Sequence, residues 1–276
     1  MKIAVLSGKG GTGKTIVSAS LAVSLGSSQY IDCDVEEPNG ALFLNPAIEH
    51  SIPVSVLVPA VDEEKCSGCG DCARACRFNA IAAVKGKVII FPEICHHCGA
   101  CVIACPEKAI SECEREIGVV ESDGKGHFLQ GRLNIGEPVT IPIINKLKRS
   151  IREDIPAILD CCPGAACTVV KTIEGCDYCI LVTEPTPFGL HDLNIAAALV
   201  RKMGMPFGVV VNKAMEGDQS IQQFCSSENI KILMEIPYMR EIAEAYSNGL
   251  LPVHLDKEWE NRFIRLYYNA KGGRAT

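Results

Sequence analysis

Two groups of residues in this chain have the types and the spacing that could do chemistry. Near the N-terminus, a lysine and a threonine close a glycine-rich stretch, "GKGGTGKT", which runs from Gly8 to Thr15. In the middle of the chain, eight of the 16 cysteines fall in two compact runs, "CSGCGDCARAC" and "CHHCGACVIAC". The first pattern is typical of a loop that binds phosphate, and the second is typical of iron–sulfur ligation.

The glycine-rich stretch matches the pattern G-x-x-x-x-G-K-[ST] and lies between an apolar strand and a helical pattern, as that motif requires. Glycines let successive N–H groups curl around a phosphate, and the helix N-terminus adds its positive dipole end. We expect Lys14 to neutralise phosphate oxygens and Thr15 to ligate Mg²⁺. The predicted nucleotide contacts of the loop are Gly8, Lys9, Gly10, Gly11, Thr12, Gly13, Lys14 and Thr15.

Polar residues end three later apolar runs that are predicted to be strands. Asp32 and Asp34 lie in "YIDCDVEEPN", Asp160 and Gly164 lie in "AILDCCPG", and Asn212 lies in "VVVNK". Ligands of open α/β sheets gather at the carboxyl ends of the strands. An aspartate there can hold Mg²⁺ through water, and a glycine shortly after it can offer an N–H to the γ-phosphate. The three segments and the loop together predict a complete nucleotide site.

Each cysteine run reads C-x₂-C-x₂-C-x₃-C, the spacing of two-cluster bacterial ferredoxins, in which the fourth cysteine serves the other cluster. We therefore expect one [4Fe-4S] cluster on Cys66, Cys69, Cys72 and Cys105, and a second on Cys95, Cys98, Cys101 and Cys76. The pattern departs from the usual one at Arg77, where the second run has Pro106. Two Cys₄ zinc sites are the alternative, but zinc sites usually pair two C-x₂-C units across a longer gap.

Cys33, Cys161, Cys162, Cys179 and Cys225 lie in or beside apolar runs, and we interpret them as small buried hydrophobic residues. A structural role is the default interpretation for all eight cysteines outside the two runs. They include the C-x₂-C of Cys176 and Cys179, for which only a dimer partner could supply a second pair.

Apolar β-branched runs alternate with helical patterns over residues 1–58 and 140–255, which is the βαβ signature of a parallel sheet. The predicted fold is α/β, a mostly parallel P-loop NTPase sheet formed by residues 1–60 and 114–276. Residues 61–113 are predicted to be an inserted, small α+β ferredoxin-like domain. The expected strands are 3–7, 30–34, 157–160, 179–183, 207–212 and 231–236, the expected helices are 14–25, 190–203, 220–228 and 240–247, and a hairpin is expected over 115–138.

The composition restricts the partners. The formal charge is −6, from 33 acidic and 27 basic residues, so a broad basic field for nucleic acid is not expected. No run approaches the ~18 consecutive apolar residues of a membrane span, and no secretory leader is recognised. We expect a cytoplasmic protein that binds neither nucleic acid nor membrane.

The C-terminal segment "DKEWENRFIRLYYN" places four apolar side chains on one helical face, Trp259, Phe263, Leu266 and Tyr267. Such a helix could lie on a membrane surface or dock on its own core. The nearby acidic residues weaken affinity for anionic lipid, so docking is favoured.

With Lys9 two residues after Ser7, the glycine-rich loop resembles the deviant Walker A motif of the MinD, ParA and Mrp class of ATPases, which are relatives of the nitrogenase iron protein. The resemblance extends over both sides of the cysteine-rich insert. It implies a homodimer in which Lys9 reaches the partner's phosphates. It also implies that Asp34 positions the attacking water, that Asp160 holds Mg²⁺ and that Asn212 contacts adenine.

The resulting hypothesis is an ATPase that transfers a phosphoryl group to water, with Lys9, Lys14 and Asp34 as its catalytic residues. Fully thiolate-ligated clusters suit electron transfer, so ATP would gate electron delivery from two [4Fe-4S] clusters to a redox partner. One alternative is a Mrp-type carrier that hands clusters to an apo-acceptor protein. Another is a spatial regulator of the MinD or ParA kind with redox-sensing clusters.

Overall fold

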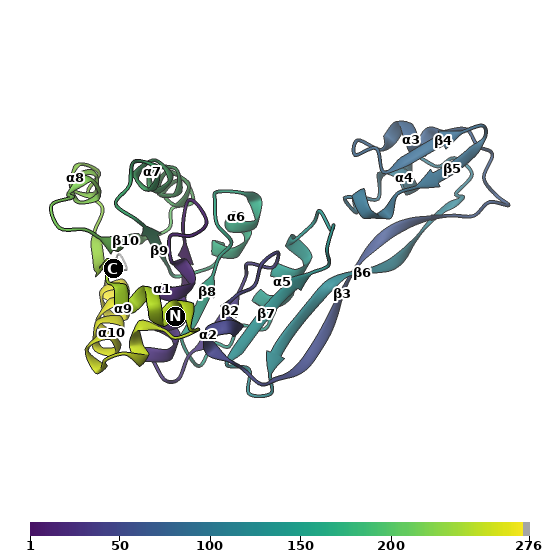
Figure 1. Cartoon of the computed structure of the whole chain (residues 1–276). Coiled ribbons are helices and arrows are strands. Elements are labelled where there is room, and N and C mark those ends of the chain that lie inside the picture. Colours follow the sequence, from purple (N-terminus) through teal and green to yellow (C-terminus); the bar gives the residue numbers. More distant parts are fainter. Residues whose placement is uncertain (273–276) are drawn as a thin grey trace.

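A computed structural model describes residues 1–272 of the chain, and its main body is a sheet with helices on both faces (Figure 1). The strand order of this nine-stranded sheet is β11-β10-β9-β1-β8-β2-β7-β6-β3. Neighbouring strands from β11 to β7 run parallel, whereas β6 pairs antiparallel with both β7 and β3. The prediction of a mostly parallel α/β sheet is confirmed.

The strands are β1 (Lys2–Leu6), β2 (Gln29–Asp32), β3 (Ile48–Val61), β4 (Ile81–Val84), β5 (Lys87–Ile90), β6 (Ile110–Asp123), β7 (Phe128–Leu133), β8 (Ala157–Asp160), β9 (Tyr178–Thr183), β10 (Phe207–Ala214) and β11 (Ile232–Pro237). The α-helices are α1 (Lys14–Ser24), α2 (Ala41–Leu44), α3 (Asp71–Ala75), α4 (Ala100–Ile103), α5 (Ile141–Arg149), α6 (Cys167–Ile173), α7 (Pro187–Lys202), α8 (Ser220–Ser227), α9 (Arg240–Ser247) and α10 (Lys257–Gly272).

Two apolar cores lie on opposite faces of the sheet. One core packs α5, α6, α7 and α8 on the sheet through residues such as Ile143, Val169 and Leu193. The other packs α1, α9 and α10 through residues such as Val17 and Phe263. The parallel strands are therefore covered on both sides, which explains why their sequences are continuously apolar rather than alternating.

The expected strands and helices are present with ends displaced by up to three residues. The largest displacement is at α7, which begins at Pro187 rather than Leu190. The Thr186 hydroxyl accepts a hydrogen bond from the backbone N–H of Gly189, and proline at the first helical position needs no donor. This N-cap starts the helix before its apolar periodicity begins.

A long two-stranded ribbon leaves the sheet at one edge and carries the cysteine-rich segment at its tip (Figure 1). Its strands, β3 and β6, have 14 residues each and pair from Ile48 with Asp123 to Val61 with Ile110. Residues 62–109, with α3, α4 and the β4–β5 hairpin, lie beyond that last pair. The hairpin expected over 115–138 is confirmed as β6 and β7, but the ribbon itself is longer than expected.

The ribbon is attached to the body by packing. Val54, Val56 and Val58 of β3 are buried in the same core as α5, and that core continues into Ala80 and Cys95 of the cysteine-rich segment. The segment is therefore not a loosely tethered unit.

The C-terminal helix α10 docks on the sheet. Trp259, Phe263, Leu266 and Tyr267 are all at most 8% exposed, so the predicted docking is confirmed. Within residues 1–272, no helix combines the length and the apolar character needed to cross a membrane.

Candidate functional site

The glycine-rich loop joins β1 to α1, and its shape depends on glycine at two points. Gly11 and Gly13 have φ angles of 81° and 89°, in the left-handed region that favours glycine. A Cβ on Gly13 would also lie 2.1 Å from Nδ2 of Asn212. That Asn212 amide donates to the Thr12 carbonyl at 2.8 Å, so the end of β10 is held directly against the loop.

A cavity of about 400 Å³ lies over the loop, a volume typical of small-molecule sites. Of the residues predicted to bind nucleotide, those that line it are Gly10, Gly11, Thr12, Gly13, Lys14, Thr15, Asp34 and Asn212. Its other walls include Asn39 and, beyond β11, Tyr238, Met239 and Tyr246, none of which was expected. The segment that follows β11 has no motif, so only the sheet order brings it here.

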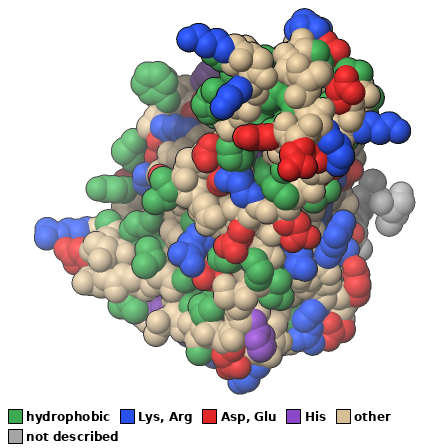
Figure 2. Space-filling model, turned by 90° about the vertical axis from the view of Figure 1, so that its right-hand side faces the viewer, with side chains coloured by type: hydrophobic (Ala, Val, Ile, Leu, Met, Phe, Trp, Pro, Cys, Tyr) green, Lys and Arg blue, Asp and Glu red, His purple; other side chains and the backbone are tan. Residues whose placement is uncertain are grey.

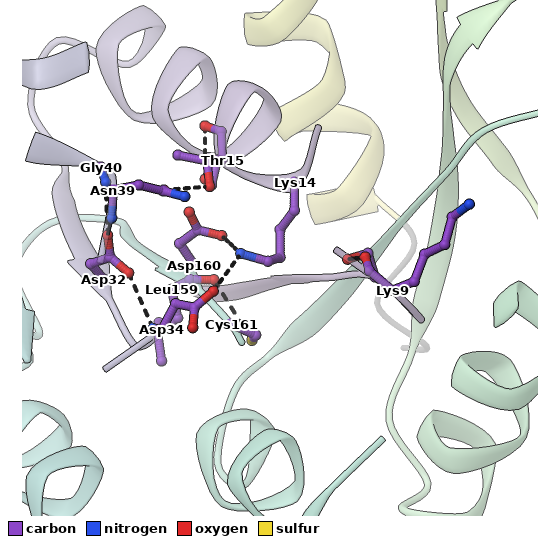
Figure 3. A network of polar contacts seen from close by, with 12 residues as sticks. Lys9, Lys14, Thr15, Asp32, Asp34, Asn39, Gly40, Leu159, Asp160 and Cys161 are labelled. Atoms are coloured by element: carbon purple, nitrogen blue, oxygen red, sulfur yellow. Dashed lines mark hydrogen bonds and ion pairs between the residues drawn. The ribbon is translucent and has the colours of Figure 1, made fainter. Parts of the chain in front are cut away.

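The Lys14 ammonium lies among buried carboxylates (Figure 3). It is 2.8 Å from Oδ1 of Asp160 and 3.8 Å from Oδ2 of Asp34. Burial disfavours the ammonium, but the charge of Asp160, its hydrogen bond and the charge of Asp34 together raise the pKa of Lys14. The lysine therefore stays charged, and it is close to two of the carboxylates expected to act on nucleotide.

Three aspartates at the ends of β2 and β8 share this region with one lysine. Burial and the neighbouring charge of Asp160 raise the pKa of Asp32. Burial also raises the pKa of Asp34 to about 6, although Lys14 opposes the shift. Asp32 is further held by backbone N–H groups of Asn39 and Gly40, at 3.1 and 2.8 Å from its Oδ2. The site therefore favours binding of a cation.

Thr15 has a side-chain partner that the sequence did not reveal. Its hydroxyl donates to Oδ1 of Asn39 at 2.8 Å. Asn39 closes the "DVEEPN" segment that begins at Asp34. A threonine oxygen and an amide oxygen thus meet beside the aspartates, and oxygen ligands are the kind that Mg²⁺ prefers.

Four of the predicted site residues do not line the cavity. Lys9 points away from the group around Lys14 (Figure 3) and lies 2.7 Å from Oε1 of Glu184. The N–H of Gly164 donates to the Ser7 carbonyl at 2.9 Å. Asp160 is fully buried behind Lys14. Gly8 is pressed against α7, where a Cβ would lie 2.4 Å from that of Asp192.

The eight motif cysteines surround two small cavities at the tip of the ribbon. One is lined by Cys66, Cys69, Cys72 and Cys105, and the other by Cys76, Cys95, Cys98 and Cys101. Each cavity thus combines three cysteines of one run with the last cysteine of the other. The structure brings together the same two sets of four that the spacing predicts.

The backbone repeats between the two runs. Gly70 and Gly99, at equivalent positions, have φ angles of 78° and 69°, and the next equivalent pair, Gly68 and His97, has φ of 72° and 55°. Each run then enters a short helix, α3 or α4. The two halves therefore have the same local fold, which is the basis of the crossed arrangement.

No group of three or more His, Cys, Asp or Glu side chains within residues 1–272 is arranged to hold a single metal ion. His96 is exposed and stacks on Phe78, with ring centroids 3.8 Å apart. The Nδ1 of His97 lies 3.3 Å from the Leu57 carbonyl oxygen, and its Nε2 is buried. His97 therefore packs between the cysteine-rich segment and the ribbon.

Cys33, Cys161, Cys179 and Cys225 are at most 1% exposed and lie in the core. Burial raises the pKa of the Cys179 thiol well above its usual range and that of Cys176 to about 12. Both thiols therefore stay protonated, as expected of buried structural residues.

Comparison with known proteins identifies the family. Residues 3–253 match the CobQ/CobB/MinD/ParA nucleotide binding domain. The chain belongs to this family. The match spans both flanks of the cysteine-rich segment. The members of this family are P-loop ATPases, in agreement with the glycine-rich loop and the parallel sheet of this MinD/ParA-type chain.

Two relatives of this MinD/ParA-type chain are uncharacterized proteins of Methanocaldococcus jannaschii. One is 32% identical over 261 residues, covering 90% of each chain. The other is 29% identical over 278 residues, covering 98% of this chain and 96% of the relative.

Solved structures of similar fold include two archaeal MinD proteins. The cell division ATPase MinD of Pyrococcus furiosus superposes with a TM-score of 0.59 at 18% identity, covering 98% of both chains. MinD of Pyrococcus horikoshii complexed with Mg-ADP gives 0.57 at 20% identity, covering 96% of this chain and 93% of that one. At these identities the similarity establishes the fold alone.

Proposed function

We propose that this chain is an ATP-hydrolysing iron–sulfur protein, in which nucleotide binding at the glycine-rich loop gates electron transfer through two [4Fe-4S] clusters. The observation that carries the proposal is the pair of four-cysteine cavities on the same chain as a nucleotide-sized cavity. Family membership supports the ATPase part. The cysteine geometry supports the iron–sulfur part.

Two existing contacts around the loop would be exchanged when MgATP binds. Lys14 would leave Asp160 for phosphate oxygens, and the Thr15 hydroxyl would leave Asn39 for Mg²⁺. Asp34, at the rim of the cavity, would orient the attacking water, while Lys14 stabilises the negative charge that develops on the phosphoryl group. The Mg-ADP complex of the Pyrococcus horikoshii MinD supports this class of ligand.

Lys9 and Gly164 would complete the site in a homodimer. Lys9 would exchange Glu184 for the partner's phosphate, and Gly164 would exchange the Ser7 carbonyl for the γ-phosphate. Two conformations with different affinity for nucleotide are what any ATP-driven change requires.

The two cysteine cavities fit iron–sulfur cubanes better than zinc. A [4Fe-4S] cubane accepts and donates single electrons, and each of its thiolates binds a different iron atom. Such thiolates lie further apart than four ligands of one ion. Backbone N–H groups of His97 and Ala109 approach Sγ of Cys95 and Cys105 at 3.4 and 3.2 Å, a contact that stabilises a cluster's sulfur ligand.

Hydrogen bonds connect the nucleotide site to the cysteine-rich segment. The Val35 carbonyl, next to Asp34, accepts from the N–H of Leu133 at the end of β7 at 2.8 Å. The next residue, Asn134, donates its N–H to the Ile117 carbonyl of β6, also at 2.8 Å. These two hydrogen bonds would transmit a movement of Asp34 to β6 at the base of the ribbon.

Arg115 of β6 contacts both the loop that follows β7 and the cysteine-rich segment. Its Nη2 lies 2.7 Å from Oε2 of Glu137 and donates to the Pro92 carbonyl at 3.0 Å. Pro92 precedes Cys95 by three residues. The guanidinium therefore links the loop after β7 to the second cysteine run.

Anaerobic reconstitution followed by EPR of the reduced protein, with and without MgATP, tests the proposal. We expect two [4Fe-4S] signals whose shape or potential changes with MgATP, and no change in a Lys14→Ala variant. Signals and potentials that are indifferent to MgATP, with and without a reduced acceptor protein, would contradict gating.

Cysteine variants test the crossed ligand sets. Cys105→Ser is expected to disturb the cluster that the first run holds, although Cys105 belongs to the second run. Cys113→Ser is the matched control, because Cys113 is exposed nearby on β6 and lines neither cavity. Zinc in place of iron after anaerobic purification would contradict the iron–sulfur assignment.

A cluster carrier is the second candidate function. It is favoured by Cys69 and Cys98, because one cysteine of each set is exposed to an approaching acceptor. Incubation of the loaded protein with an apo-ferredoxin and MgATP distinguishes the two. Iron that moves to the acceptor supports the carrier, whereas retained iron with electron transfer supports the gated electron donor.

A further inference from the structure

Both carboxylate oxygens of Asp160 have a side-chain donor. Lys14 donates to Oδ1, and the hydroxyl of Tyr30 donates to Oδ2, each at 2.8 Å. Asp160 is fully buried and Tyr30 is 2% exposed. The lysine is part of the recognised loop motif, but the tyrosine belongs to no motif.

Tyr30 occupies a position in β2 that an apolar side chain could fill. It lies on the α1 face of the sheet, opposite Ile158 of β8, and its ring stacks on Phe128 with centroids 5.8 Å apart. A buried tyrosine hydroxyl without a partner destabilises a core. The hydrogen bond to Asp160 satisfies the hydroxyl, and it also determines the orientation of the aspartate.

The ring has little freedom to swing away. Its hydroxyl end lies against Gly40, where a Cβ would come within 2.6 Å of two ring carbons and of the hydroxyl oxygen. Gly40 is itself held by its N–H to Oδ2 of Asp32 at 2.8 Å. Phe128 and Gly40 therefore clamp the ring so that its hydroxyl stays directed at Asp160.

The hydroxyl is a donor to Asp160 and also has a side-chain hydrogen bond with Ser18. Burial and the charges of Asp160 and Asp32 raise the pKa of Tyr30 well above its usual range, so it keeps its proton. Lys14, in contrast, is the donor that the proposed nucleotide chemistry removes from Asp160. Once Lys14 turns to phosphate, Tyr30 is the described side chain that remains hydrogen-bonded to this carboxylate.

We propose that Tyr30 is a positioning residue for Mg²⁺ binding, which fixes the Asp160 carboxylate through Oδ2 so that Oδ1 keeps the orientation in which it now accepts from Lys14. This inference rests on the proposed function, because it takes Asp160 as the aspartate that holds Mg²⁺. Without the hydroxyl, Asp160 would lose its fixed orientation beside Asp32 and Asp34, whose charges repel it. Metal affinity would fall, whereas the loop's contacts with phosphate would remain.

The test compares Tyr30→Phe with Phe128→Leu in the full-length protein. The first variant removes only the hydroxyl and keeps the stacked ring. The second removes the stack and keeps the hydroxyl. Mn²⁺ binding in the presence of a non-hydrolysable ATP analogue is followed by EPR, Mg²⁺ dependence of hydrolysis by steady-state kinetics, and ADP binding in EDTA by calorimetry.

For Tyr30→Phe we expect the half-saturating Mn²⁺ and Mg²⁺ concentrations to rise about tenfold or more, the size of a lost charge-assisted hydrogen bond. Metal-free ADP affinity should stay within about twofold of the unaltered protein. Phe128→Leu loosens the ring but keeps the hydroxyl, so it should lower the Tm and raise the half-saturating metal concentrations by less than Tyr30→Phe does. Circular dichroism establishes that each variant is folded.

Equal metal dependence in Tyr30→Phe and the unaltered protein would overturn the positioning role while leaving the ATPase proposal intact. A parallel loss of metal-free ADP affinity would also overturn it, because that result indicates a general structural effect. If the unaltered protein itself shows no Mg²⁺-dependent nucleotide binding, the proposed function fails and this inference fails with it.

Discussion

The ammonium of Lys9 lies 2.7 Å from Oε1 of Glu184 within the same chain. The other oxygen of that glutamate is 3.0 Å from Nζ of Lys213, which also donates to the Gly11 carbonyl. Burial opposes ionisation of the carboxyl, but the hydrogen bonds from Lys9 and Lys213 lower the pKa of Glu184 below its usual range. In the nucleotide-free chain, the lysine expected to act across a dimer is therefore held in cis.

Glu184→Gln is expected to strengthen ATP-dependent dimerisation about fivefold, because a partly exposed ion pair of about 1 kcal/mol no longer competes for Lys9. Sedimentation velocity with and without MgATP measures the effect. Glu174→Gln, which breaks an exposed pair with Lys171, is the matched control. A dimer that is unchanged or weakened in Glu184→Gln would show that the Lys9 contact does not compete with association.

The contribution of Asp34 to the stability of the nucleotide-free protein is expected to fall as the pH rises from about 4 to about 6. Burial raises the pKa of Asp34 to about 6, whereas an unfolded chain has a value of about 3.9. Between these values the folded state binds the extra proton, so the free energy of unfolding decreases with rising pH and then levels off. Asp32 adds a contribution of the same sign.

Asp34→Asn should therefore raise the Tm at pH 7.5 by a few degrees and make its pH dependence shallower, without removing the contribution of Asp32. Differential scanning calorimetry from pH 4.5 to 8 measures both. Asp256→Asn, at an exposed position, serves as the control. A steeper pH dependence in Asp34→Asn would contradict the raised pKa.

Arg115→Lys is expected to weaken coupling between nucleotide and clusters while leaving iron content unchanged. A lysine cannot contact both carboxylate oxygens of Glu137 and the Pro92 carbonyl as the guanidinium does. The measured quantity is the MgATP-induced change in the EPR signal, which should fall at least twofold. Arg132→Lys on β7, at an exposed pair with Glu121, is the control, and an undiminished MgATP effect in Arg115→Lys would exclude this link.

Phe263→Ala should lower the free energy of unfolding by about 3–5 kcal/mol, the usual effect of removing a large buried ring. Phe263 is fully buried in the core beneath α10, whereas Tyr268 on the same helix is 62% exposed. Tyr268→Ala should change stability by less than about 1 kcal/mol. Urea denaturation gives both values, and similar losses in the two variants would contradict the docked orientation of α10.

Much of the parallel sheet could be predicted, because most of its strands, such as β1, β8, β9 and β10, are built on short apolar runs. The ribbon strand β3 could not. Its sequence contains Pro53 and Pro59, and proline argues against a strand because it has no N–H to donate. The structure places β3 at the edge of the sheet, where prolines are tolerated on the unpaired side.

Some residues of the candidate site could likewise be predicted from the sequence, and others could not. Lys14, Asp34 and Asn212 could be predicted to lie together, because the ends of parallel strands share one edge of the sheet. Asn39, Tyr238 and Tyr246 could not, since they lie in irregular segments or short helices without a local signature. The ion pair of Lys9 with Glu184 could not be predicted either, because two residues so distant in sequence meet only through the way the loop after β9 folds back.

The distribution of charge on the surface around the ribbon tip is relevant to the prediction that the protein does not bind nucleic acid. On the face shown in Figure 2, basic side chains alternate with acidic and hydrophobic ones rather than forming one positive field. The predicted lack of affinity for nucleic acid remains a prediction, and this face offers it no contradiction.

The length of the ribbon makes it a lever arm. Beyond Gly118, the last residue of β6 that pairs with β7, residues 110–117 extend roughly 27 Å toward the tip at about 3.4 Å per residue. A tilt of about 5° at that point would swing the cysteine cavities by about 2 Å or more, given that rise per residue. Electron tunnelling falls steeply over such distances, so a rearrangement near Asp34 too small to see in the body could switch contact at the far end on or off.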